Sequence, residues 1–116
     1  MKLGKDTAIT WLGHSTFRIK TPGGKSLLID PFLEKNPRCP DDQREQTGID
    51  AILITHGHFD HVADAATTAV TNSAPILCMF DLASWFESHG VRDIVGFNLG
   101  GTVEVAGIRA TMVEAR

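Results

Sequence analysis

Short apolar runs, each ending at a glycine, a proline or a polar residue, divide the chain into segments. Residues 16–20 are predicted to form a half-exposed β-strand, because apolar and polar side chains alternate from residue 17 to residue 20. Residues 26–29 are largely apolar without alternation up to Asp30, which is typical of a strand buried on both faces. Similar runs predict further strands at residues 8–12, 51–55, 76–79, 93–97, 102–105 and 108–113.

Two segments between these strands favour helix. Apolar residues recur at helical spacing in residues 63–72 and in residues 82–89, where we expect Asp81 to be the N-cap and Gly90 the stop. The order of strands and helices predicts a single α/β (α+β) domain over residues 1–116. We expect a mixed sheet with helices on one side.

Some residues are assigned to structure and not to function. The stretch at residues 32–48 is polar and long, which predicts a lid or mobile loop with solvated charges at Arg38, Asp41, Asp42 and Arg44. Aromatic side chains outside that loop are assigned to packing: Trp11, Phe17, Trp85 and Phe86.

Composition narrows the classes of function. With 116 residues, 42% of them hydrophobic and 22% charged, the chain can form one modest core and is not disordered. Eleven basic against 14 acidic residues give a formal net charge of −3, which argues against a nucleic-acid partner. No apolar run predicts a membrane span or a signal peptide, so we expect a cytoplasmic protein with Cys39 and Cys78 as free thiols.

The segment from His56 to His61 reads His-Gly-His-Phe-Asp-His and holds three of the five histidines. If the backbone stays extended after the preceding strand, His56 and His58 project to the same side and can bind one metal ion, with Gly57 leaving space between them. Asp60 and His61 then lie where a helix begins and can reach a second site. Imidazole and carboxylate ligands without thiolate suit zinc, manganese or iron.

Such a cluster is typical of metal-dependent hydrolysis. A metal ion with an open position lowers the pKa of its bound water to about 7, which supplies hydroxide at neutral pH. Asp60 would hold a metal ion, orient the attacking water or accept its proton. The alternative is a histidine-rich solvated loop or an adventitious metal site, which the strand-then-helix context disfavours.

Residues 55–61 resemble the signature of the metallo-β-lactamase-fold hydrolases. Residues 11–17, 28–32 and 98–103 resemble the branch that contains L-ascorbate-6-phosphate lactonase and poorly characterised bacterial and archaeal metal-dependent hydrolases. The resemblance implies the N-terminal half of an αββα sandwich and one or two divalent ions, with zinc expected and manganese or iron as alternatives. It assigns the first ion to His56 and His58 and the second to Asp60 and His61.

Members of that family also use a later histidine, a bridging aspartate and a last histidine, for which this sequence has no counterpart. His89 is expected to interact with free carbonyl groups at a helix C-terminus and not to bind metal. We therefore expect the chain to be the N-terminal half of a longer hydrolase.

Two further residues have competing interpretations. The resemblance makes Asp30 a carboxylate that supports the metal ligands, while its position before Pro31 also suits a plain turn residue. His14 by resemblance lies near the metal cleft and contacts substrate, and a plain loop histidine is the alternative.

The expected function is hydrolysis of an ester, lactone or phosphodiester bond in a small-molecule substrate by metal-bound hydroxide. The alternative is a catalytically inert metal-binding half-domain that needs the missing C-terminal half or a partner chain. Both hypotheses allow the chain to form a homo-oligomer.

Overall fold

Six strands of the chain form one mixed sheet in the order β1-β2-β3-β4-β5-β6. β1, β2 and β3 pair antiparallel, whereas β3 to β6 run parallel to one another. The computed structural model describes residue 1 and residues 4–115, so the ends of the expected domain at residues 2, 3 and 116 lie outside it. The strands are β1 (Ala8–Trp11), β2 (Phe17–Lys20), β3 (Ser26–Ile29), β4 (Ala51–Leu53), β5 (Ile76–Met79) and β6 (Ile94–Phe97).

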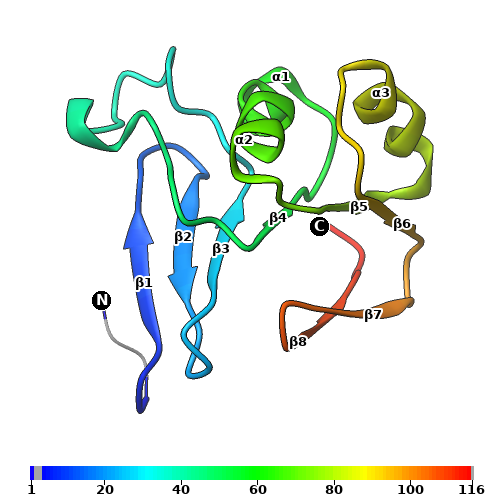
Figure 1. The fold of residues 1–116 in the computed structure, drawn as a ribbon, viewed down its shortest axis with the longest axis horizontal. Coiled ribbons are helices and arrows are strands. Elements are labelled where there is room, and N and C mark those ends of the chain that lie inside the picture. Colours follow the sequence, from blue (N-terminus) through cyan, green and yellow to red (C-terminus); the bar gives the residue numbers. More distant parts are fainter. Residues whose placement is uncertain (2–3, 116) are drawn as a thin grey trace.

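Helices connect the parallel strands. α1 (Phe59–Val62) and α2 (Ala65–Asn72) lie between β4 and β5, and the short 3-10 helix η2 (Phe80–Leu82) and α3 (Ala83–Ser88) lead to β6. A second short 3-10 helix, η1 (Asp41–Gln43), lies in the connection between β3 and β4. Figure 1 shows α1, α2 and α3 on one side of the sheet, as expected, and the hairpin of β7 (Thr102–Val105) and β8 (Ile108–Thr111) on the other.

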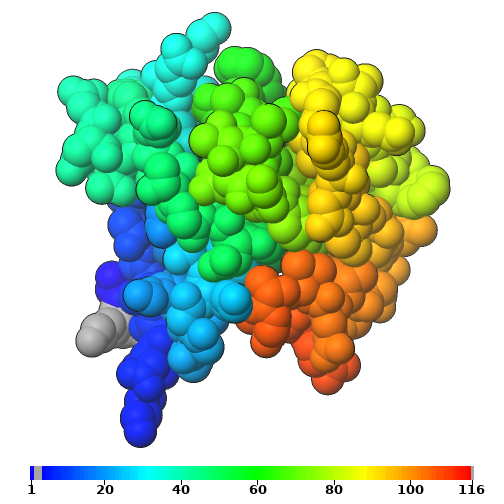
Figure 2. All heavy atoms as spheres, in the orientation of Figure 1, coloured from blue at the N-terminus to red at the C-terminus, as the bar shows by residue number. Residues whose placement is uncertain are grey.

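Both faces of the central strands are buried. On the helical face, Leu28, Ile52 and Ile76 pack with residues of α2 and α3. On the opposite face, Leu27 and Leu77 pack with residues of the β7–β8 hairpin. Since neighbouring side chains of a strand point to opposite faces, this arrangement explains the unalternated apolar runs. In Figure 2 the orange hairpin and the blue strand β1 lie on opposite sides of the view.

Several predicted boundaries are wrong. Helix begins at Phe59, which confirms the placement of Asp60 and His61 at a helix start but precedes the helix predicted at residues 63–72. The helix is divided at Asp64, whose N–H donates to the carbonyl of Pro31 and whose Oδ2 accepts from the N–H of Leu33 at 2.6 Å. These contacts stabilise the break between α1 and α2.

The predicted N-cap of the later helix is also wrong. Asp81 is not the N-cap, because it lies within η2 and α3 starts after Leu82 without a side-chain cap. The strands predicted at residues 51–55 and 108–113 end two residues early.

The loop at residues 32–48 is more tightly packed than predicted. Leu33, Asn36, Cys39 and Gln46 are buried in it. Nη1 of Arg44 donates to three backbone carbonyl oxygens of the loop at 2.6, 2.8 and 2.9 Å. The prediction of solvated charge is therefore wrong for Arg44, whereas Arg38, Asp41 and Asp42 are exposed as expected.

The two tryptophans do not belong to the core, contrary to expectation. Trp11 is 57% exposed and donates from Nε1 to the carbonyl of His14, and Trp85 is 44% exposed and stacks on His89. Phe86 is fully buried as predicted. Both cysteines are free, also as predicted. Among the described residues no helix is long and apolar enough to cross a membrane.

Candidate metal site

Strand register brings three chain segments to one edge of the sheet. Trp11 pairs with Phe17, and Phe17 pairs with Ile29, so the turn between β1 and β2 lies beside the end of β3. β3 and β4 run parallel, which places the residues after both strands at the same edge. His14 from the turn, Asp30 after β3 and the motif after β4 therefore meet there.

Asp30 is at the centre of this meeting point and is only 2% exposed. Its Oδ1 accepts from the N–H of Thr55 at 2.7 Å, and its Oδ2 lies 2.8 Å from Nδ1 of His61. Its backbone has φ 48°, a left-handed conformation typical of a turn, and its carbonyl accepts from the hydroxyl of Thr16 at 2.8 Å. Asp30 therefore ends the strand as a turn residue and also orients a histidine of the motif.

The three histidine rings of the motif lie close together. The ring centroid of His56 is 4.0 Å from that of His61 and 4.7 Å from that of His58. His58 is extended at φ −66° and ψ 147° and precedes α1 directly. A Cβ on Gly57 would lie 2.9 Å from Cδ2 of Leu82, so the glycine lets η2 approach the motif closely.

His14 contacts the aspartate of the motif. Its Nε2 lies 2.7 Å from Oδ2 of Asp60, and its ring centroid is 5.8 Å from that of His61 and 5.7 Å from that of Phe32. The hydrogen bond from His14 lowers the pKa of the Asp60 carboxyl, with a smaller contribution from the nearby His61. Asp60 is thus held in its charged form.

The donor atoms present fit a divalent metal ion. Two groups of the described residues each bring three possible donor atoms within 4.8 Å of one another: Asp30, His56 and His61, and His14, Asp60 and His61. Both groups combine imidazole nitrogens with carboxylate oxygens, which is the ligand chemistry of zinc, manganese and iron. They share His61, so the predicted assignment of ligands to two separate ions remains a prediction.

One residue beside the site was not among the predicted site residues. Thr55 contacts both Asp30 and His56 through its hydroxyl, and its position directly before the motif is the sequence signal that could have drawn attention to it. The expected contact of His89 with a helix carbonyl is confirmed, since His89 follows α3 and its Nδ1 lies 2.7 Å from the carbonyl oxygen of Trp85.

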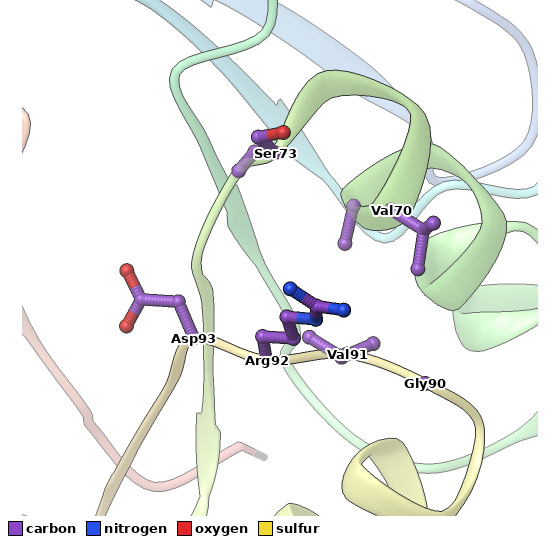
Figure 3. A pocket seen from close by; sticks show the side chains of 8 residues that line it. Val70, Ser73, Gly90, Val91, Arg92 and Asp93 are labelled. Atoms are coloured by element: carbon purple, nitrogen blue, oxygen red, sulfur yellow. The ribbon is translucent and has the colours of Figure 1, made fainter.

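Hollows of the surface lie at both edges of the sheet. One of about 300 Å³ is lined by Leu53, Thr55, Phe97 and residues 110–115, and so reaches the residue before the motif. Another of about 320 Å³ lies between α2 and the segment leading to β6 and includes Arg92 (Figure 3). The second hollow is at the opposite edge from the histidines, where the parallel strands begin.

Comparison with known families agrees with this arrangement. Residues 8–116 match the family described as the beta-lactamase superfamily domain. The chain belongs to this family. Its lineage is therefore the one that the motif indicated, whereas the lactonase branch remains a prediction.

Curated relatives of this beta-lactamase superfamily chain are named metal-dependent hydrolases. A UPF0173 metal-dependent hydrolase of Roseiflexus castenholzii is 55% identical over 118 residues, which cover 97% of this chain and 48% of the relative. A second, from Koribacter versatilis, is 45% identical over 107 residues, which cover 92% of this chain and 46% of the relative. The chain thus spans about half the length of these relatives.

Solved structures share the fold. Igni18, titled a novel metallo hydrolase from Ignicoccus hospitalis, superposes with a TM-score of 0.68 at 26% identity, covering 87% of this chain and 45% of that one. CmlA, described as a diiron beta-hydroxylase from Streptomyces venezuelae, has a TM-score of 0.70 at 20% identity, and the match covers 94% of this chain and 24% of CmlA. The second likeness shows the fold alone. The mixed sheet and its helices are therefore those of metallo-beta-lactamase-fold proteins.

Proposed function

We propose that this chain forms the metal-binding part of a hydrolase that cleaves an ester, lactone or phosphodiester bond in a small molecule. The observation that carries the proposal is that three segments distant in sequence bring His14, Asp30 and the residues of the His56–His61 motif together at one sheet edge. The names of the curated relatives support the same reaction class.

His56, His58, Asp60 and His61 would hold one or two divalent ions, with zinc as the first candidate and manganese or iron as alternatives. A bound ion would supply a Lewis acid and a water of lowered pKa. The chain itself would contribute fixed ligand directions, since Nδ1 of His61 is bonded to buried Asp30 and Oδ2 of Asp60 is bonded to His14.

Asp60 would be the catalytic carboxylate. The hydrogen bond from His14 engages Oδ2, while Oδ1 lies 3.7 Å from Nε2 of His61. Because that bond stabilises the charged carboxylate, Asp60 is better suited to hold an ion or orient a water than to accept a proton. His14 would be close enough to this group to contact a substrate as well.

The proposal is tested by zinc titration and by hydrolysis of three probes: 4-nitrophenyl acetate, a δ-lactone and bis(4-nitrophenyl) phosphate. We expect tight zinc binding that weakens more than about tenfold in His56→Ala and His61→Ala. The matched control is His89→Ala, which removes an exposed histidine bonded only to its own α3 segment in the described part of the chain. Equal zinc binding by all four proteins would contradict the assignment.

The second candidate function is a metal-binding half-domain that is inert alone. The observation that favours it is the share of the curated relatives that this chain matches, 48% and 46%. Stoichiometric zinc binding without hydrolysis of any probe would support it, and hydrolysis that depends on Asp60 would exclude it.

A further inference from the structure

The hydroxyl of Thr55 joins the buried Asp30 to the first histidine of the motif. Its Oγ1 lies 2.5 Å from Oδ2 of Asp30 and 2.9 Å from Nδ1 of His56. Thr55 is itself exposed, so burial does not require a threonine at this position. The two hydrogen bonds of its hydroxyl, to Asp30 and to His56, therefore distinguish threonine from residues without a hydroxyl at this position.

The direction of these hydrogen bonds follows from the chemistry of the groups. A threonine hydroxyl has one proton, and a carboxylate only accepts. A separation of 2.5 Å is at the short end for a hydroxyl bonded to a carboxylate, so the proton of Thr55 points to Asp30. The oxygen of Thr55 then accepts, which requires the proton of the neutral His56 ring to be on Nδ1.

His61 provides a direct comparison within the same site. Its Nδ1 lies 2.8 Å from the same Oδ2 of Asp30, so it too donates from Nδ1. One buried carboxylate thus orients His61 directly and His56 through a hydroxyl. The carboxylate is a firm anchor, because the carbonyl of Asp30 is bonded to the buried Thr16 and its Oδ1 to the backbone of Thr55.

We infer that Thr55 is a positioning residue that holds His56 in the Nδ1–H tautomer, with Nε2 free to bind a divalent cation. Binding of the cation by His56 depends on the proposed function, whereas the tautomer is a property of the metal-free chain. Fixing the ring before binding removes part of the ordering cost that the cation would otherwise meet. Groups that orient a metal-binding imidazole in this way commonly change metal affinity by about 10- to 100-fold when removed.

The experiment is long-range ¹H–¹⁵N NMR of the metal-free, ¹⁵N-histidine-labelled chain at pH 8, where ring tautomers have distinct nitrogen shifts. Thr55→Val removes the hydroxyl at nearly constant volume, Thr55→Ser restores it, and Thr55→Ala is a second deletion. Thr67→Val is the matched control at an exposed helical threonine. We expect Nδ1–H for His56 in the original chain and in Thr55→Ser, and loss of that preference in Thr55→Val, with His61 unchanged in all.

Zinc affinity, measured by competition with a chelator, provides the second readout. It should fall about 10- to 100-fold in Thr55→Val and stay within about threefold in Thr55→Ser. The inference is wrong if His56 carries its proton on Nε2 in the original chain, or if Thr55→Val changes neither tautomer nor affinity. If the original chain binds no zinc, the proposed function fails, while the tautomer comparison still decides the role of Thr55.

Discussion

Nε2 of His14 lies 2.7 Å from Oδ2 of Asp60, and this contact joins residues 46 positions apart in the sequence. His14 comes from the turn between β1 and β2 and has φ 54°, whereas Asp60 lies in the first turn of α1. The turn is held by Trp11, whose Nε1 donates to the carbonyl of His14. An exposed tryptophan thus supports the position of a site residue.

Replacing His14 should raise the pKa of the Asp60 carboxyl toward its ordinary value of 3.8. His14→Asn is the suitable change, because asparagine tolerates a left-handed backbone but is too short to make the same hydrogen bond. In the original chain Asp60 contributes stability above its unfolded pKa, and the contribution is lost as the pH falls through the lower folded value. Carboxyl ¹³C NMR of the metal-free chain measures the pKa, and an unchanged value would show that His14 is not the cause.

Removing the carboxylate of Asp30 should both destabilise the chain and loosen the site. Asp30→Ala leaves the hydrogen-bond donors of Thr55 and His61 without their acceptor, and we expect a loss of about 2–3 kcal/mol in the free energy of unfolding. Zinc affinity should fall about 10- to 100-fold. Asp30→Asn keeps one acceptor oxygen and tolerates φ 48°. Its free energy of unfolding, measured with urea, should therefore lie between those of the original chain and Asp30→Ala.

Two glycines with positive φ should respond differently to alanine. Gly13 has φ 98°, and a Cβ there would lie 2.7 Å from the backbone carbon of Arg38, so Gly13→Ala should cost about 3 kcal/mol or more. Gly24 has φ 81° with open space around the Cβ position, and Gly24→Ala should cost about 1 kcal/mol. Urea denaturation of both variants separates the steric contact from backbone strain, and equal losses would argue against the contact.

The two thiols should resist modification in the folded chain. Burial raises the pKa of Cys78 to about 11, and burial also raises that of Cys39, against an opposing effect of Arg44. Ellman's reagent at pH 8 should therefore react slowly until urea is added. The stability that Cys78 contributes is complete below about pH 9 and is lost as the pH rises toward about 11, because the unfolded thiol ionises first. Rapid labelling of the native chain would contradict the buried positions.

The elements predicted correctly from the sequence are those determined by a local pattern of apolar and polar residues. The apolar runs around Leu28 and Ile52 correctly indicated strands buried on both faces. Predictions failed where a distant residue decides the local structure. The helix break at Asp64 depends on Pro31 and on Leu33 of the loop at residues 32–48, and the packing of that loop depends on Arg44. None of these contacts leaves a periodic signal in the sequence.

At the site, sequence spacing placed the histidines of the motif together but could not provide their supporting contacts. The motif contained His56, Asp60 and His61 within one short segment, and the structure brings His14 and Asp30 to it through strand register. Side-chain geometry decides which nitrogen of each histidine ring makes a hydrogen bond, and sequence spacing cannot predict it.

The loop at residues 32–48 should depend on the guanidinium of Arg44. Arg44→Ala removes the donor to the carbonyl oxygens of Leu33, Glu34 and Asn36, and we expect a loss of about 1–2 kcal/mol in the free energy of unfolding. Limited proteolysis should then cut within this loop faster than in the original chain.

Arg44→Lys keeps the charge but not the planar donor group, so it should restore only part of that protection. The control is Arg38→Ala, an exposed arginine in the same loop. If both alanine variants are cut at the same rate, loss of positive charge would explain the effect and the carbonyl contacts would not. The histidine tautomers should be unchanged in either variant, because Asp30 and Thr55 are anchored by β3, β4 and Thr16 and not by Arg44.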